Sequence, residues 1–426
     1  MVSHRDRKLM NALLNQLPTV GSKRLAVRVT PDAHRQLRGG SPWLYDGSIT
    51  AVNHVGAPGD LAVVFDDERN FVAIGLWDPE SPIRVKVLHA GKPVQIDAAF
   101  WRNHVSNALD RRASLTDDPT TTGYRCIHGE NDGFPGLVVD RYEETLVVKL
   151  YTAAWFPHLA DVVGALDELL SPKRVMLRLS RGVALGETFG LADGDALLGG
   201  APTTPVLFRE RGLVMEADVV HGNKTGHFLD QRDNRALVRG MAKGLTVLDV
   251  FSNTGGFALS AAAGGATSVH LVDQSVPALA TAERNMHHNR HLREVRECEV
   301  TTTVGDAFDV LDDLATRHQR FDIVILDPPS FASNQTAVPG ALKAYARLTR
   351  SGMKVVKDGG VLIQASCSSR VTADDFADTV LATANANGRV KELRRTGHPA
   401  DHPISFEFGG YLKVMYLSVK SAGTKN

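Results

Sequence analysis

Short apolar segments alternate with segments of helical periodicity through the second half of the chain. Strands are predicted over residues 246–251, 268–272, 299–304, 321–326 and 360–365. Helical segments lie between them, and this alternation predicts an α/β fold, in which a parallel sheet carries helices on both faces. Two more predicted strands, 391–396 and 411–419, have no helix between them, so we expect them to pair antiparallel.

An aspartate lies at or just after the end of each of the first four strands. These residues are Asp249, Asp273, Asp306 and Asp327. Ligands of open α/β sheets bind beyond the carboxyl ends of the strands, so we expect the four carboxylates to share one site. Asp273 follows Asp249 by 24 residues, the place and spacing of an acid that binds ribose hydroxyls. A single such aspartate is usually a turn or a cap, but four in succession indicate a nucleoside cofactor.

The loop after the first strand reads Phe251-Ser252-Asn253-Thr254-Gly255-Gly256. Paired glycines allow a ligand to approach the backbone just before a helix begins. Neither the G-x-G-x-x-G fingerprint nor a phosphate-loop motif is present, which disfavours a dehydrogenase. S-adenosylmethionine contains ribose and adenine but no phosphate, and therefore fits better. We expect Phe251, Asn253, Thr254 and Gly255 to contact it.

The fourth and fifth strands end in residues that suit covalent chemistry on a base. Asp327-Pro328-Pro329 forms a rigid turn after the fourth strand, and Cys367 follows the fifth. Cytosine C5 is a poor nucleophile, but a thiolate that adds at C6 makes C5 enamine-like. We therefore predict that Cys367 is the nucleophile and that Asp327, near base N3, stabilises the added state.

Composition limits the remaining classes. Lys and Arg number 48 and Asp and Glu number 48, so the formal net charge is zero, which excludes only a uniformly basic coat for nucleic acid. The three cysteines lie far apart and form no Cys-x-x-Cys pair, so neither a disulfide scaffold nor a metal site is expected. No apolar run spans a membrane, and we expect a cytoplasmic protein.

The 426 residues suggest more than one domain. We predict an N-terminal extension over 1–22, with a short amphipathic helix, and a small β-barrel over 23–95. An α+β linking domain is expected over 96–205 and the α/β domain over 206–426. Four arginines in a basic region near the start of the barrel are candidates for phosphate contacts. They are Arg24, Arg28, Arg35 and Arg38.

Taken together, the motifs resemble the bacterial large-subunit ribosomal RNA cytosine-C5 methyltransferases that carry an N-terminal PUA domain. The resemblance covers about residues 23–420. Its carriers are Ser41-Pro42-Trp43, Gly129-Glu130-Asn131-Asp132-Gly133, Lys224-Thr225-Gly226, Leu229-Asp230-Gln231-Arg232, Phe251 through Gly256, Asp327-Pro328-Pro329 and Ser366-Cys367-Ser368.

This resemblance implies a PUA barrel at 23–95 and a Rossmann-like class I methyltransferase domain. It implies S-adenosylmethionine as cofactor, Cys367 as nucleophile and 23S ribosomal RNA, or a large-subunit precursor, as partner, and it allows a homodimer. The implied cofactor contacts are Gln231, Asp249, Gly255, Asp273, Asp306 and Asp327. The sequence departs from the family at Ser330, where a basic residue is common, and at Ser369, where glycine is common.

Two other functions remain open at this point. An RNA N-methyltransferase of the same fold needs no enzyme nucleophile, because nitrogen supplies its own lone pair, and Cys367 would then be dispensable. A non-catalytic RNA-binding module would not bind S-adenosylmethionine.

Overall fold

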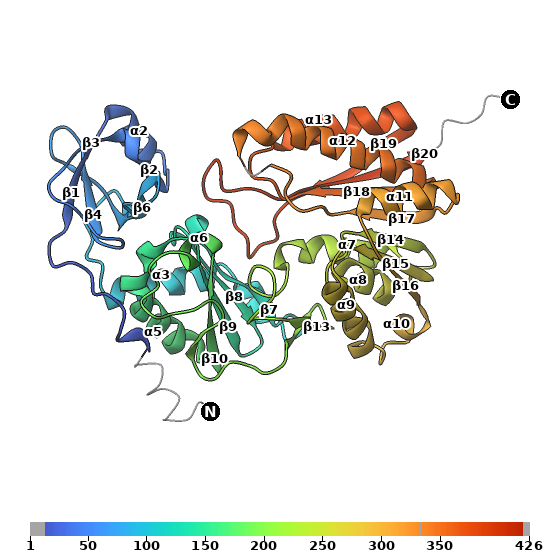
Figure 1. Ribbon diagram of the computed structural model, residues 1–426, viewed down its shortest axis with the longest axis horizontal. Coiled ribbons are helices and arrows are strands. Elements are labelled where there is room, and N and C mark those ends of the chain that lie inside the picture. The colour runs from blue at the N-terminus through green and yellow to red at the C-terminus, as the bar shows by residue number, and fades with distance from the viewer. Residues whose placement is uncertain (1–12, 333, 421–426) are drawn as a thin grey trace. The chain divides into compact units, whose positions relative to one another are not determined.

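The computed structural model describes residues 13–332 and 334–420, and the chain divides into two compact units (Figure 1). The first unit comprises the chain up to Arg209, Glu216–Leu229 and Ala400–Gly409. The second comprises Glu210–Met215, Asp230–Pro399 and the chain from Gly410. The four-part division predicted from the sequence stays a prediction. Most of the predicted N-terminal extension lies outside the described residues, as does Leu9 of its expected helix.

The first unit begins with a six-stranded sheet in the order β2-β6-β5-β4-β1-β3. The strands are β1 (Leu25–Val29), β2 (Trp43–Tyr45), β3 (Ile49–Val52), β4 (Leu61–Phe65), β5 (Phe71–Trp77) and β6 (Ile83–Ala90). A β-rich region was expected here, but helix α2 (Pro31–Arg38) was not. Its start has local signals, because the Thr30 hydroxyl accepts a bond from the Ala33 amide (3.3 Å) and Pro31 occupies the first turn.

A second sheet of the first unit has the order β11-β10-β9-β8-β7. Its strands are β7 (Gly123–His128), β8 (Leu137–Tyr142), β9 (Thr145–Leu150), β10 (Arg174–Leu179) and β11 (Ala196–Leu198). The helices around it are α3 (Ala98–Asp110), α4 (Ala113–Thr116), η3 (Ala153–His158), α5 (Leu159–Leu170) and α6 (Arg181–Ala184). Trp101 and Trp155 are fully buried against each other in its core, with ring centroids 5.5 Å apart.

The turn that follows β7 is built around a buried ion pair. Asp132 ends the short helix η2 (Gly129–Asp132), and Gly133 then takes the left-handed conformation (φ 78°). The Arg112 guanidinium donates to both oxygens of Asp132, at 2.9 and 2.6 Å, and both side chains are fully buried. The same guanidinium donates to the carbonyl of Asp401 (2.9 Å), in the 400–409 segment of this unit. The turn therefore joins segments that are distant in the sequence.

The chain passes between the units through the hairpin β12 (Val206–Glu210) and β13 (Leu213–Ala217). The second unit is a seven-stranded sheet in the order β16-β15-β14-β17-β18-β20-β19. Its strands are β14 (Thr246–Val250), β15 (Ser268–Asp273), β16 (Glu299–Val304), β17 (Phe321–Leu326), β18 (Val356–Ser366), β19 (Arg389–Thr396) and β20 (Lys413–Lys420). The first five are parallel, and β20 pairs antiparallel with both β18 and β19, which confirms the predicted α/β sheet.

Helices cover both faces of this sheet (Figure 1). They are η4 (Leu229–Gln231), α7 (Arg232–Met241), α8 (Gly256–Ala263), α9 (Val276–His288), α10 (Arg293–Glu297), α11 (Ala307–Thr316), η5 (Gln335–Ala337), α12 (Val338–Val355) and α13 (Ala373–Asn387). Helices α7 to α10 pack on one face, and α11, α12 and α13 pack side by side on the other. A buried cluster that includes Leu326, Tyr345 and Phe376 fills the space between the sheet and α12 and α13. Across residues 13–332 and 334–420, no helix is long and apolar enough to cross a bilayer.

Candidate cofactor site and nucleophile

The carboxyl ends of five parallel strands bring the predicted site residues to one edge of the second unit's sheet. Asp249 pairs with Leu271 on one side and Ile325 on the other. Asp273 is the last residue of β15, and Asp306 and Asp327 follow β16 and β17 within two residues. Cys367 directly follows β18. Residues separated by up to 118 positions thus share one edge, as the alternation of strands and helices predicts.

Asp249 is the most deeply buried of these acids, with 1% of its surface exposed. One carboxylate oxygen, Oδ2, accepts a bond from the Ala258 amide in the first turn of α8 (3.0 Å). The other oxygen is buried without a hydrogen-bond partner. Burial, together with the nearby Asp327 and Asp273, raises the pKa of Asp249 to about 8. An acid held in this way has one oxygen available to a polar ligand.

The loop between β14 and α8 has an unusual backbone. Phe251, Asn253 and Gly255 have φ values of 64°, 47° and 74°, and such left-handed conformations are strained for the first two. A Cβ on Gly255 would lie 2.7 Å from Ala282 Cβ, so glycine is required there for packing as well. The Asn285 amide holds the Thr254 carbonyl (2.9 Å). The loop is thereby fixed close against α9.

Asp273 connects this loop to the next strand. Its Oδ2 accepts from the Asn253 amide (2.8 Å) and its Oδ1 from the Ser275 amide (2.8 Å). Each oxygen retains a second lone pair, as the ribose-binding role predicted for this acid requires. Asp306 is different, because it is exposed and caps α11 by accepting from the Phe308 amide (2.9 Å). Its other oxygen accepts from Gln274 (2.9 Å).

Asp327 lies beside the start of α7. It is partly buried, and burial together with the neighbouring Asp230 raises its pKa to about 7, against the effect of its hydrogen bond with Gln231. Gln231 is buried, and its Oε1 accepts from Asn234 (2.7 Å). Asp230 in turn accepts from the Tyr411 hydroxyl (2.8 Å). The predicted pair Gln231 and Asp327 is therefore brought together by the fold.

The Cys367 thiol adjoins the proline turn. Its Sγ donates to the carbonyl oxygen of Pro328 at 3.8 Å. Cys367 is partly exposed, whereas Cys126 and Cys298 are buried. The neighbouring Ser366 bonds to the Tyr345 hydroxyl (2.8 Å), and the Ser368 hydroxyl donates to the carbonyl of Ala332 (3.3 Å). Of the three cysteines, Cys367 is the one placed at the edge that carries the four acids.

The residues at this edge fit S-adenosylmethionine. Asp249 Oδ1 and Ser252 Oγ are buried without protein hydrogen-bond partners, so a polar ligand would satisfy them. The missing Cβ at Gly255 lets the loop pack against Ala282 of α9, which holds the loop at this edge. The carboxylates of Asp273 and Asp327 suit hydroxyl and amino groups. All the individual cofactor contacts stay predictions, namely those of Gln231, Asp249, Phe251, Asn253, Thr254, Gly255, Asp273, Asp306 and Asp327.

Two further side chains contribute to this site, and one of them, Lys413, was not found from the sequence. Asn234 accepts from the Tyr416 hydroxyl (2.9 Å) and donates to Gln231. Lys413 donates to carbonyl oxygens of the turn that follows Cys367. Asn234 lies two residues after the Leu229-Asp230-Gln231-Arg232 motif of the family resemblance, but no local pattern marks Lys413. The Lys224-Thr225-Gly226 motif belongs to the first unit, where the Thr225 hydroxyl donates to Asp140 (2.5 Å).

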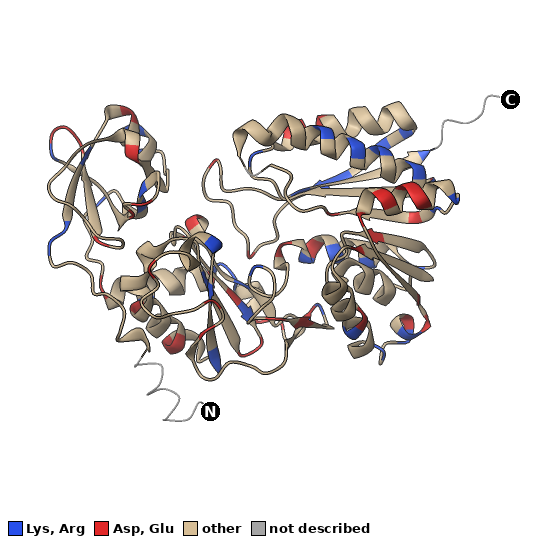
Figure 2. Cartoon of the chain, viewed as in Figure 1, with Lys and Arg blue, Asp and Glu red and all other residues tan. Residues whose placement is uncertain are grey.

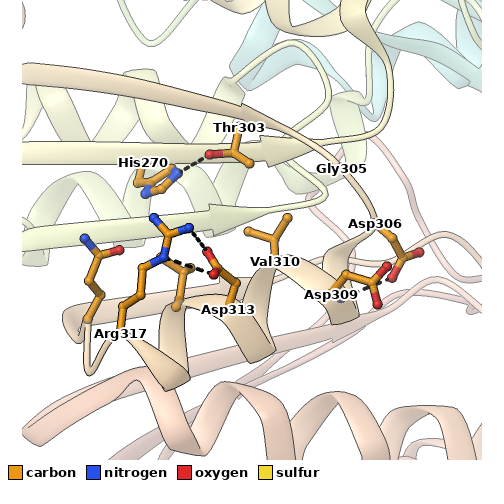
Figure 3. A pocket seen from close by; sticks show the side chains of 10 residues that line it. His270, Thr303, Gly305, Asp306, Asp309, Val310, Asp313 and Arg317 are labelled. Carbon is orange, nitrogen blue, oxygen red and sulfur yellow. Dashed lines mark hydrogen bonds and ion pairs between the residues drawn. The ribbon is translucent and has the colours of Figure 1, made fainter.

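A groove of about 330 Å³ lies between β15, β16 and α11 (Figure 3). His270 bonds there to the Thr303 hydroxyl (2.8 Å), and Asp313 pairs with Arg317 (2.9 Å). Asp309 and Asp313 of α11 are in its lining, and Figure 2 shows the acidic positions of this helix in red. Asp306 is the one predicted site residue in its lining, which does not include Cys367. The groove therefore does not include the predicted nucleophile.

The four arginines predicted to contact phosphate are all exposed in the first unit. Arg24 precedes β1, Arg28 lies on it, and Arg35 and Arg38 lie on α2. Arg35 is paired with Asp32 (2.9 Å), which offsets part of the local positive charge. Their contact with RNA stays a prediction.

The sheet order, the acids at successive strand ends and the glycine loop define a class I methyltransferase that uses S-adenosylmethionine. The family model of the S-adenosylmethionine-dependent methyltransferases matches residues 125–412, and that of the PUA-like domain matches residues 27–90. The chain belongs to this methyltransferase family.

Curated relatives match over almost their full length. The chain is 44% identical over 408 residues to a protein of Deinococcus radiodurans named ribosomal RNA large subunit methyltransferase, covering 94% of this chain and 99% of the relative. It is 34% identical over 397 residues to ribosomal RNA large subunit methyltransferase I of Pseudoalteromonas translucida, covering 92% and 99%. A SAM-dependent methyltransferase structure from Streptococcus mutans superposes with a TM-score of 0.78 at 23% identity, covering 92% of this chain and all of that one. That likeness confirms the fold.

Proposed function

We propose that the protein transfers a methyl group from S-adenosylmethionine to C5 of a cytosine in large-subunit (23S) ribosomal RNA, with Cys367 as the covalent nucleophile. The names of the curated relatives support large-subunit ribosomal RNA as substrate. The observation that carries the cytosine-C5 chemistry is the place of Cys367, partly exposed and 3.8 Å from the Pro328 carbonyl oxygen beside Asp327.

S-adenosylmethionine, when bound, supplies the methyl group as an electrophile. The Cys367 thiolate adds to C6 of cytosine, which forms the S–C6 bond and gives C5 the electron density to accept that methyl group. A base then removes the C5 proton, the S–C6 bond breaks and the thiolate is released. The cytosine ring thereby becomes aromatic again, as 5-methylcytosine. Methylation of an exocyclic amine would need none of these steps.

Asp327 is suited to the pyrimidine N3. With its pKa raised to about 7, a substantial fraction of the carboxyl is protonated near neutral pH. A protonated carboxyl can donate a hydrogen bond to N3, where negative charge accumulates after thiolate addition at C6. Pro328 and Pro329 have no amide hydrogens and keep the turn that carries Asp327 extended. We propose that Asp327 stabilises the adduct in this way.

The first unit supplies the RNA-binding part of the proposal. A PUA-like domain matches residues 27–90, within the predicted domain 23–95. We propose that 96–205 links it to a methyltransferase domain at 206–426 and that Arg24, Arg28, Arg35 and Arg38 contact phosphates. A homodimer and a cytoplasmic location stay predictions.

Bisulfite sequencing of total RNA tests this function, because 5-methylcytosine resists the conversion that unmodified cytosine undergoes. The comparison uses RNA from cells that lack the protein and RNA from the same cells complemented with either wild type or Cys367→Ala. We expect one protected cytosine in 23S ribosomal RNA with wild type and none with the variant. Protection restored by Cys367→Ala would exclude the covalent mechanism. A methylated amine in place of 5-methylcytosine would establish the N-methyltransferase alternative.

A further inference from the structure

The first residue of β20, Lys413, lies directly across from the end of the strand that carries the nucleophile. In the antiparallel pairing of β18 with β20, Lys413 is the partner of Ser366, the residue before Cys367. The Lys413 ammonium donates to the carbonyl oxygen of Ser368, the residue after Cys367. It also donates to the carbonyl oxygen of Val371 (2.7 Å). One side chain thus spans the turn from Cys367 to the start of α13.

The rest of this turn is held from other elements. Tyr345 of α12 bonds to Ser366 (2.8 Å), and the carbonyl of Ala332 accepts from the Ser368 hydroxyl (3.3 Å). These bonds fix both neighbours of Cys367 but are made by neutral groups. Lys413 adds hydrogen bonds from a charged ammonium group, and such charge-assisted hydrogen bonds are stronger than those between neutral groups.

Lys413 and Cys367 also interact electrostatically. Burial lowers the pKa of Lys413 to about 8, and the interaction with Cys367 acts in the opposite direction, in favour of the ammonium. The same interaction favours the thiolate over the thiol, since coupling between two titrating groups is reciprocal. Two other groups face this region. Tyr345 has a pKa raised to about 12 and stays neutral, and Asp327 opposes negative charge when ionised.

We propose that Lys413 is a positioning residue for the nucleophile: its ammonium group fixes the Cys367 turn and stabilises the Cys367 thiolate. The proton of the thiol leaves to solvent. This inference rests on the proposed function of Cys367, but its test requires neither RNA nor cofactor.

The test is the pH dependence of Cys367 alkylation by iodoacetamide, followed by peptide mass spectrometry on the full-length protein. Lys413→Gln removes the charge and retains a hydrogen-bond donor, whereas Lys413→Arg retains both. Cys126 and Cys298 serve as internal references, because burial raises the pKa of these thiols to about 12 and about 11.

In wild type we expect a titration midpoint for Cys367 below the ordinary thiol value of about 8.5. Lys413→Gln should move the midpoint up by about one unit, which lowers the alkylation rate at pH 7 roughly five- to tenfold. Lys413→Arg should return the midpoint to near the wild-type value. Thermal unfolding of each variant confirms that the fold is intact.

Equal midpoints in wild type and Lys413→Gln would overturn the inference. If Lys413→Gln does not fold, wild type and Lys413→Arg decide: a wild-type midpoint at or above about 8.5 contradicts the inference, and low midpoints in both proteins support it. Failure of the proposed function is seen separately, as methylation that survives Cys367→Ala. The alkylation result stands whichever way that experiment turns out.

Discussion

The thiol of Cys367 lies 3.8 Å from the carbonyl oxygen of Pro328, although 39 positions separate the two residues in the sequence. The contact exists because β17 and β18 are adjacent and parallel, so that the turns after them meet at one edge of the sheet. It places the proposed nucleophile beside a carboxyl group of raised pKa, at the edge that also holds the acids predicted to bind the cofactor.

Asp249 makes the stability of the free protein dependent on pH. Its folded-state pKa, raised to about 8 by burial, exceeds the unfolded value of about 3.9. The folded state therefore binds the proton more tightly, and stability is lost as the pH rises between these two values. Each unit of pKa difference corresponds to about 1.4 kcal/mol, so the loss amounts to a few kcal/mol.

Thermal unfolding of the cofactor-free protein from pH 5 to pH 8 checks this. The melting temperature of wild type should fall over that range, and that of Asp249→Asn should fall less. Asp313→Asn is the matched control, because Asp313 is half exposed on the surface of α11. Parallel pH dependences for wild type and Asp249→Asn would show that Asp249 ionises normally.

Gly255→Ala should weaken cofactor binding and destabilise the protein. The residue has a φ of 74°, and an added Cβ would meet Ala282 at 2.7 Å, so the loop or α9 must shift. We expect a loss of about 1–3 kcal/mol and at least a tenfold weaker affinity for S-adenosylmethionine by calorimetry. Gly240→Ala is the control: it lies in α7 with open space around it and should stabilise by about 0.5–1 kcal/mol. Equal affinities in the two variants would argue against a role of this loop.

Two adjacent arginines that contact the same carboxylate should differ sharply in their effect on stability. Arg112 is fully buried with Asp132, whereas Arg111, which also bonds to Asp132 (3.1 Å), is 52% exposed. Arg112→Met leaves a buried carboxylate without its main partner and should cost about 3–5 kcal/mol. Arg111→Met should cost about 1 kcal/mol or less. Urea unfolding measures both, and similar losses would mean that burial does not govern this network.

Neutralising Arg24, Arg28, Arg35 and Arg38 to glutamine should flatten the salt dependence of RNA binding. Each lost phosphate contact lowers the slope of log affinity against log salt by about 0.7 on single-stranded RNA. Arg293 and Arg317, which are exposed and paired within their own helices, provide a control double variant. An unchanged slope in the fourfold variant would place the RNA on another surface.

The sequence predicted those features of the site that depend on the order of neighbouring residues along the chain. Strand ends are marked by the change from apolar to polar residues, so the edge with Asp249, Asp273, Asp306 and Asp327 could be predicted, and Cys367 with it. Helix α2 shows the limit of this approach, because a run of short strands around it outweighed its Thr30 cap and Pro31 start.

Residues that act through long-range pairing could not be predicted. The local sequence does not distinguish Lys413 from other lysines that adjoin apolar strands. Only the register of β18 and β20 places it opposite Ser366. The sequence around Arg112 is typical of a charged and exposed helix end. Arg112 is nevertheless fully buried, because Asp132 and the Asp401 carbonyl surround it. Such positions depend on contacts 20 and 289 residues away, which no local pattern encodes.

Trapping of the covalent adduct tests the central claim most directly. RNA in which cytidine is replaced by 5-fluorocytidine still accepts the Cys367 thiolate at C6 and the methyl group at C5. Fluorine at C5 cannot leave as the proton does, so the S–C6 bond persists. Wild type with S-adenosylmethionine should give a denaturation-resistant protein–RNA complex whose linked peptide contains Cys367, and Cys367→Ala should give none. A complex of equal yield with Cys367→Ala, or none with an active wild type, would contradict the account.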